Sequence, residues 1–167
     1  MLIRIPLLAL ALLAMLAPAA AAEEWQYEGG SVPIAYIDNG PAQFQFACRG
    51  GDLAMGFWVR APNRQVAGAG TMSVAISADP SEGAAISAAG GSSFAPDQPL
   101  IHADGSSVIV RGPVARQWAR IAQRARSTIA VAYVRPGAGG KLEVFDANRF
   151  GAKGSSSAIG KVLERCG

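Results

Sequence analysis

Histidine and cysteine are scarce in this chain of 167 residues, which contains one histidine and two cysteines. A typical zinc site needs three or four histidine, cysteine or carboxylate ligands close together, so this composition argues against one. The sequence has no Asp-x-Asp-x-Asp-Gly loop for calcium. Its glycine-rich stretches at 90–93 and 137–140 lack the lysine of a phosphate-binding loop and are interpreted as turns. We therefore expect no metal and no cofactor.

A catalytic set is missing as well. A serine triad would need the single histidine, His102, as its base, with Asp97 or Asp104 to orient it. It lies beside a turn, two residues before Asp104, and no Gly-x-Ser-x-Gly nucleophile motif is present. The sequence therefore favours a protein that is not an enzyme. A hydrolase that uses His102 is the alternative from another class.

Long apolar runs are absent after the first 22 residues, so no later segment is expected to cross a bilayer. The start of the chain has the pattern of a secretory signal peptide: a positive Arg4, an apolar stretch at 7–16, and three alanines before Glu23. An uncleaved membrane anchor is the competing interpretation, but the apolar stretch is short for a span. We expect cleavage after residue 22 and a single periplasmic or secreted domain at 23–167.

Charge is low, at 16% of residues, with a formal net charge of +3 that falls to +2 (3 − 1) without Arg4. This excess is too small to predict nucleic acid as a partner. Positive charge is nevertheless concentrated, with no intervening acidic residue, at Arg111, Arg116, Arg120, Arg124 and Arg126. Such a face suits an acidic protein, an anionic glycan or lipid head groups. An ordinary solvated helix face is the competing explanation.

The two cysteines of an exported chain predict a disulfide between Cys48 and Cys166, with a pair of free buried thiols as the alternative. Residues 43–49 alternate with Phe44, Phe46 and Cys48 on one face, and 53–59 alternate in the same way, which predicts a hairpin. In the last predicted helix, Cys166 lies on the apolar face. The spacing thus agrees with a bridge between an early strand and the final helix.

Further strands are predicted at 25–27, 31–37, 71–77, 107–111, 127–134 and 141–146. Residues 61–70 are expected to form a loop, and the structure of residues 84–103 stays open between strands and a loop. One helix is predicted after Gly112-Pro113, and a second up to Cys166, capped by one of the serines at 155–157. About eight strands followed by two late helices predict a mainly β (α+β) fold, an antiparallel sandwich or curved sheet closed by one disulfide.

The C-terminal segment combines a strand, a Gly-Ser turn and a short helix that ends in cysteine, through Gly154, Ser155, Ala158, Ile159, Val162 and Cys166. This pattern resembles small periplasmic proteins of Gram-negative bacteria, namely the VasI-type proteins associated with type VI secretion. The invasion-associated locus B proteins are a looser comparison. The resemblance implies a periplasmic β-sandwich-like domain without known catalysis, and it implies no catalytic residues.

Together, these observations predict a non-enzymatic binding or accessory protein of the cell envelope. The expected partner is an envelope protein or an anionic surface that meets the arginines. A second hypothesis is an inhibitor that inserts a loop, either 61–70 or 90–97, into the cleft of a target enzyme. The hydrolase with His102 as its base is the third.

Overall fold

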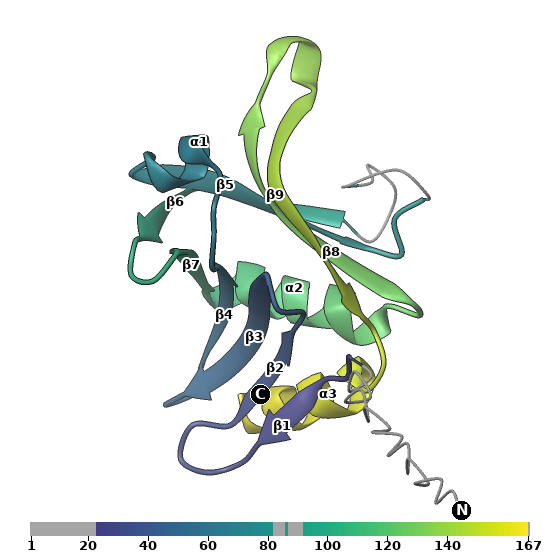
Figure 1. Ribbon diagram of the computed structural model, residues 1–167. Helices are drawn as coiled ribbons and strands as arrows, with labels where there is room; N and C mark the ends of the chain where they lie inside the picture. The colour runs from purple at the N-terminus through teal and green to yellow at the C-terminus, as the bar shows by residue number, and fades with distance from the viewer. Residues whose placement is uncertain (1–22, 82–85, 87–91, 167) are drawn as a thin grey trace, which may run out of the picture.

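The fold is described here from a computed structural model, which describes residues 23–81, 86 and 92–166. The predicted signal peptide at 1–22 lies outside the described residues, as do residues 84–85 and 87–91 of the undecided segment 84–103. Most of the rest of that segment, Ser92–Ile101, forms a strand. The described chain forms one antiparallel sheet of nine strands in the order β1-β2-β3-β4-β7-β6-β5-β8-β9 (Figure 1). The strands are β1 (Gln26–Glu28), β2 (Ile34–Asp38), β3 (Ala42–Arg49), β4 (Asp52–Val59), β5 (Thr71–Ala78), β6 (Ser92–Ile101), β7 (Ser106–Arg111), β8 (Thr128–Pro136) and β9 (Leu142–Gly151).

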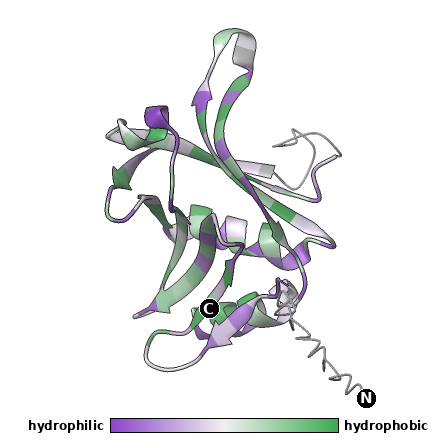
Figure 2. Cartoon of the chain, in the orientation of Figure 1, coloured by the Kyte–Doolittle hydropathy of each residue, from purple (hydrophilic) through white to green (hydrophobic). Residues whose placement is uncertain are grey.

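Strict alternation explains the β3–β4 hairpin. Every second residue of both strands is buried, and hydropathy alternates along them in the same way (Figure 2). Because side chains of a strand point alternately to its two faces, one face of the hairpin packs in the core. The turn passes through Gly50 and Gly51, whose positive φ angles of 60° and 86° suit glycine. Cys48 is opposite Leu53 on the buried face, as the sequence predicts.

The sheet curls because β6 belongs to both of its halves. This strand pairs with β5 along most of its length but with β7 only through Leu100 and Ile101. The two halves then enclose one core, in which the rings of Phe57 and Tyr133 lie 5.1 Å apart. The free edges β1 and β9 meet at Trp25, whose indole Nε1 donates to the carbonyl of Gly151 at 3.0 Å. The predicted curved sheet is thus confirmed as a nine-stranded half-barrel.

In the part of the chain that the structure describes, three helices accompany the sheet: α1 (Arg64–Ala67), α2 (Gly112–Arg124) and α3 (Ser155–Arg165), with one 3₁₀ turn at Ala138–Gly140. Helices α2 and α3 pack side by side at one end of the half-barrel (Figure 1). Their buried faces carry Trp118 and Ala122 from α2, and Ile159 and Val162 from α3. The glycine–proline start of α2 is confirmed, with the proline in the first turn.

Several local expectations are wrong. The loop at 61–70 contains α1, which forms because the Asn63 side chain caps it and Val66 is fully buried. Strand β9 continues past 146 because a bulge, with Asp146 at a φ of 46°, lets it pair with β8 up to Gly151. No serine caps α3; the capping position is Gly154, whose left-handed backbone, at a φ of 80°, turns the chain into the helix.

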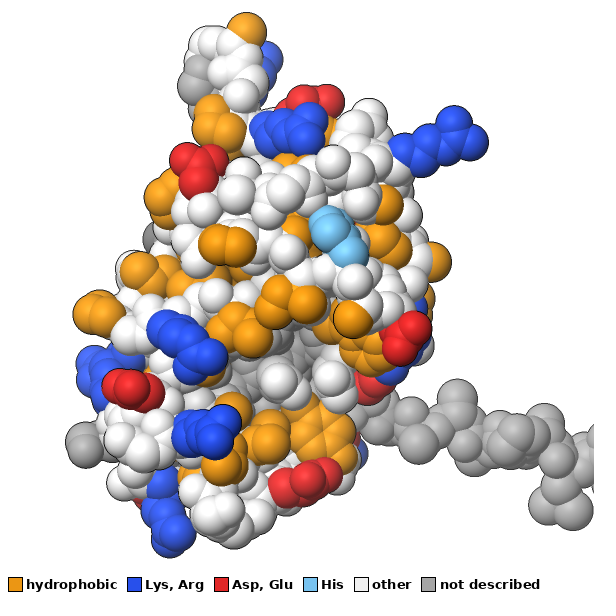
Figure 3. Space-filling model, turned by 90° about the vertical axis from the view of Figure 1, so that its left-hand side faces the viewer, with side chains coloured by type: hydrophobic (Ala, Val, Ile, Leu, Met, Phe, Trp, Pro, Cys, Tyr) orange, Lys and Arg blue, Asp and Glu red, His pale blue; other side chains and the backbone are white. Residues whose placement is uncertain are grey.

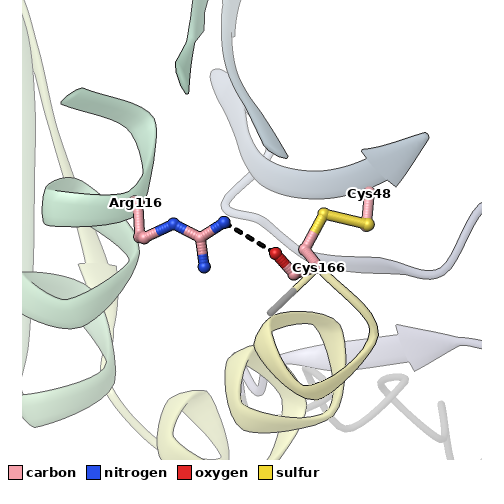
Figure 4. The surroundings of a disulfide bond; sticks show 3 residues. All are labelled: Cys48, Arg116 and Cys166. Atoms are coloured by element: carbon pink, nitrogen blue, oxygen red, sulfur yellow. Dashed lines mark hydrogen bonds between the residues drawn. A yellow bond between two sulfur atoms is a disulfide. The ribbon is translucent and has the colours of Figure 1, made fainter. Parts of the chain in front are cut away.

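The disulfide joins Cys48 of β3 to Cys166 just after α3, across 118 positions of sequence, with the two Cα atoms 5.6 Å apart (Figure 4). Both cysteines are buried. The bridge ties the end of α3 to the inner face of the first hairpin. It therefore fixes α3 beside α2, where the arginines lie.

Candidate functional site: the arginine face of α2

Helix α2 has a buried side and a cationic side. Ala115, Trp118, Ala119 and Ala122 are buried under it, and the helix contains no acidic residue. Arg120 and Arg124 lie on the opposite side and are exposed, while Arg116 is half-buried. Arg111 and Arg126 flank the helix at its two ends, and both are exposed. The sequence spacing of four residues thus produces the expected stripe, because such residues share a helix face.

Arg116 differs from the other four arginines. Its guanidinium Nη2 donates a hydrogen bond of 2.6 Å to the backbone carbonyl of Cys166, as Figure 4 shows. This contact links α2 to the end of α3, beside the disulfide. Arg116 therefore has a structural role, and the rest of its guanidinium faces the groove described below.

The other four arginines of this face keep most of their guanidinium N–H groups available as hydrogen-bond donors. The Arg124 Nε donates to the backbone carbonyl of Arg120 at 3.2 Å, within the last turn of α2, where helix carbonyls attract cations. The guanidinium groups of Arg111, Arg120 and Arg126 have no hydrogen bond or ion pair with any residue that the structure describes.

Two grooves run along this face. The first, of about 550 Å³, lies between α2 and the β3–β4 turn and is lined by Gly51, Asp52, Leu53, Gly112, Pro113, Arg116, Gln117 and Arg120. The second, of about 580 Å³, lies between α2 and α3 and is lined by Arg120, Gln123, Arg124, Gly160, Leu163 and Glu164. Each groove has two arginines and one acidic residue. Arg120 belongs to both grooves and connects them into one cationic surface, which we call the arginine face.

His102 has two partners in the fold. Its Nε2 lies 2.8 Å from the Ala69 carbonyl and its Nδ1 lies 2.9 Å from the Ser106 hydroxyl. Because a carbonyl only accepts, the neutral ring carries its proton on Nε2, and Nδ1 accepts from Ser106. Ser106 is completely buried, so its oxygen is not presented to a substrate in this arrangement. Within the described chain no hydrogen bond joins Asp97 or Asp104 to the ring.

No group of three histidine, cysteine or carboxylate residues suited to a metal ion occurs among residues 23–81, 86 and 92–166. The same residues contain no helix with the length and hydropathy that a membrane span requires. The first loop assigned to a possible inhibitor is held in place, because the Asn63 backbone N–H donates to the Asp146 carboxylate at 2.9 Å. The second loop, at 90–97, is described only from residue 92, where it belongs to β6.

Models of known protein families give no match to this chain. Searches of curated proteins and of solved structures likewise found no similar protein.

Proposed function

We propose that the protein is an exported, non-enzymatic binding module of the cell envelope, and that the arginine face contacts an acidic partner. The observation that carries the proposal is the position of Arg120. It lines both grooves, it is exposed, and its guanidinium has no partner among the described residues. A charged group in such a position is available to a second molecule without the loss of an internal contact.

The chemistry of guanidinium groups favours a carboxylate-bearing or phosphate-bearing partner. Arginine offers paired N–H donors that match two oxygens of one carboxylate or phosphate. Arg120 and Arg124 stand one turn apart, so neighbouring acidic groups of one partner can meet both. An exposed ion pair contributes only up to about 1 kcal/mol, and useful affinity therefore requires several pairs within the two grooves.

A charge-reversal experiment tests this role. The variant Arg120→Glu/Arg124→Glu alters the arginine face without touching the Arg116 contact. The control Arg64→Glu/Lys141→Glu changes net charge by the same amount on exposed residues outside both grooves. We expect wild type and control to bind washed envelope fractions alike at low salt, and the face variant to bind at least tenfold more weakly. Equal binding by all three proteins, or none by the wild type, would refute the arginine face as the contact.

The non-enzymatic part of the proposal has its own test. The burial of Ser106 and the Ala69 contact support a structural role for His102. We expect no turnover of ester, peptide or glycan substrates by the wild type. Turnover that disappears in His102→Ala, in a variant that still unfolds cooperatively, would establish the hydrolase instead.

A further inference from the structure

The outer face of β3, β4 and β7 contains a hollow of about 250 Å³ that is separate from the two grooves and has no lining residue from a helix. Its lining includes two neighbouring rows of residues on one face of the sheet, and each row runs across β3, β4 and β7. One row is Gln45, Gly56 and Ile109, and the other is Gln43, Trp58 and Ser107. Figure 3 shows the side of the molecule on which β6 and β7 lie, with hydrophobic side chains gathered across its middle.

Gly56 forms the floor of the hollow. It lies in the middle of β4, which pairs without interruption with β3 and β7, so neither a bulge nor a turn requires glycine there. Its φ angle is also negative, as in any residue of a strand. A Cβ at this position would lie 3.1 Å from the Cγ and Nε2 atoms of Gln45. Glycine inside a paired strand weakens it and often marks a place of close approach. Here the Gln45 side chain lies against Gly56, so the glycine sets the position of that amide in the hollow.

The lining of the hollow combines polar and apolar groups and carries no charged side chain. It contains two glutamine amides, the Ser107 hydroxyl, the Trp58 indole and the exposed side chain of Ile109. Neither Gln43 nor Gln45 makes a side-chain hydrogen bond within the described residues, so each amide keeps a donor and an acceptor for a ligand. Trp58 is held in place, because its Nε1 donates to the Asp104 carbonyl at 3.1 Å.

We propose that this hollow binds one ring of a neutral glycan. Paired amides both donate and accept, as neighbouring sugar hydroxyls do. Ile109 and the part of Trp58 that the stacked Arg60 guanidinium, 4.5 Å from the ring centroid, leaves uncovered offer apolar surface to the C–H face of the ring. The volume lies below the roughly 300–1,000 Å³ of pockets for drug-sized ligands, which suits a single ring. The cation stacked on Trp58, Arg60, does not line the hollow and is already paired with the Asp38 carboxylate, so the lining itself offers no cation to an anionic ligand.

An extended peptide is the other class of ligand to consider. Peptides that bind sheets add a strand at an exposed edge, where backbone groups are free. Here β4 is paired on both sides, with β3 and with β7, so its backbone offers a peptide no ladder. The hollow also shares no lining residue with either groove of the arginine face. The proposal therefore stands apart from the function proposed above.

The test is a titration of the full chain, followed by NMR or calorimetry, with neutral trisaccharides of glucose and of N-acetylglucosamine and with an uncharged peptide. Gln45→Leu removes an amide while keeping a similar volume, and Gly56→Ala adds a Cβ that displaces the Gln45 side chain from its place in the hollow. Ile101→Ser is the control, since Ile101 is exposed nearby but does not line the hollow. We expect at least one trisaccharide to bind in the millimolar range or better, and both hollow variants to weaken it about tenfold while the control does not.

Three outcomes would overturn the proposal: no trisaccharide binds at millimolar concentration, the peptide alone binds, or the hollow variants and the control bind sugar like the wild type. Should Gly56→Ala unfold, Gln45→Leu decides the question by itself, because its side chain is only half-buried and the fold does not depend on its amide.

Discussion

Loss of the Cys48–Cys166 bridge should have a large effect on stability, and its size follows from the topology. The cross-link spans 118 positions, which is most of the described chain. In the chain-entropy model, a loop of this length restricts the unfolded state by about 5 kcal/mol at 25 °C. Because domains of this size are stable by roughly 5–15 kcal/mol in total, the bridge accounts for a third or more of the expected stability.

The assay is urea unfolding of wild type, reduced wild type and Cys48→Ala/Cys166→Ala. Reduced wild type lacks the cross-link but keeps both sulfur atoms in the core, so it separates the entropy of the unfolded chain from lost packing. We expect the free energy of unfolding to fall by about 3–5 kcal/mol in both, with the double variant slightly lower. Native strain reduces the gain from a bridge, which sets the lower end of this range.

Two results would refute this reasoning. One is a difference below about 1 kcal/mol between oxidised and reduced protein, since loop closure over this length would then contribute almost nothing. The other is alkylation of both cysteines in the folded protein without prior reduction. Intact mass, measured with and without reductant on protein expressed with its own N-terminus, reports the alkylation and also the predicted cleavage before Glu23.

Two further predictions concern turns that hold the half-barrel together. Partial burial raises the pKa of Asp79, but hydrogen bonds from the backbone N–H groups of residues 126–128 and from the Ser127 hydroxyl outweigh it and lower the pKa from 3.8 to about 2. Because the pKa is lowered in the folded state, the ionised Asp79 stabilises the protein above about pH 4, and Asp79→Asn should lower the free energy of unfolding by about 1 kcal/mol at pH 7 after solvent screening. In urea unfolding, this difference between variant and wild type should shrink as the pH falls from about 4 to 2. A difference that does not depend on pH would contradict the prediction. Gly105→Ala should lower the free energy of unfolding by about 2 kcal/mol or more, because the new Cβ would lie 2.3 Å from the Val59 carbonyl oxygen at a φ of 126°. Gly70→Ala, whose Cβ meets nothing within 4 Å, is its control and should cost much less.

The hairpin and the disulfide could be predicted from sequence because their signals are local. Alternation over eight residues places Cys48 on the buried face of β3, and helical spacing places Cys166 on the apolar face of α3. Strand β6 could not be assigned in this way. Two prolines, Pro96 and Pro99, interrupt it, and they are accommodated because β6 is paired with β5 alone over most of its length. Its existence depends on pairing with β5, the preceding strand, and such pairing leaves no periodic pattern within β6 itself.

Helix α1 and the far end of β9 escaped prediction for a related reason. Four residues with one large apolar side chain, Val66, carry no periodic signal, and the helix depends on a cap at Asn63 and on burial. The bulge at Asp146 likewise makes sense only when β8 is beside β9. Where local propensity is weak, contacts with other elements of the fold determine the secondary structure, and a single sequence does not show those contacts.

The two proposed binding surfaces were also only partly predictable from local sequence. Spacing shows that Arg116, Arg120 and Arg124 share a helix face, but not that Arg116 is engaged by the Cys166 carbonyl, because that acceptor reaches α2 only once the disulfide has placed α3. The hollow at Gly56 had a visible signal, a glycine inside an alternating strand, but its walls come from three strands in register.

The difference in charge between the two surfaces has a physical consequence. Contacts through the arginine face are screened as salt rises above about 0.15 M, whereas hydrogen bonds and apolar contacts in an uncharged hollow are not. Salt dependence therefore distinguishes a ligand of the proposed arginine-face site from a ligand of the proposed hollow site before a residue is changed.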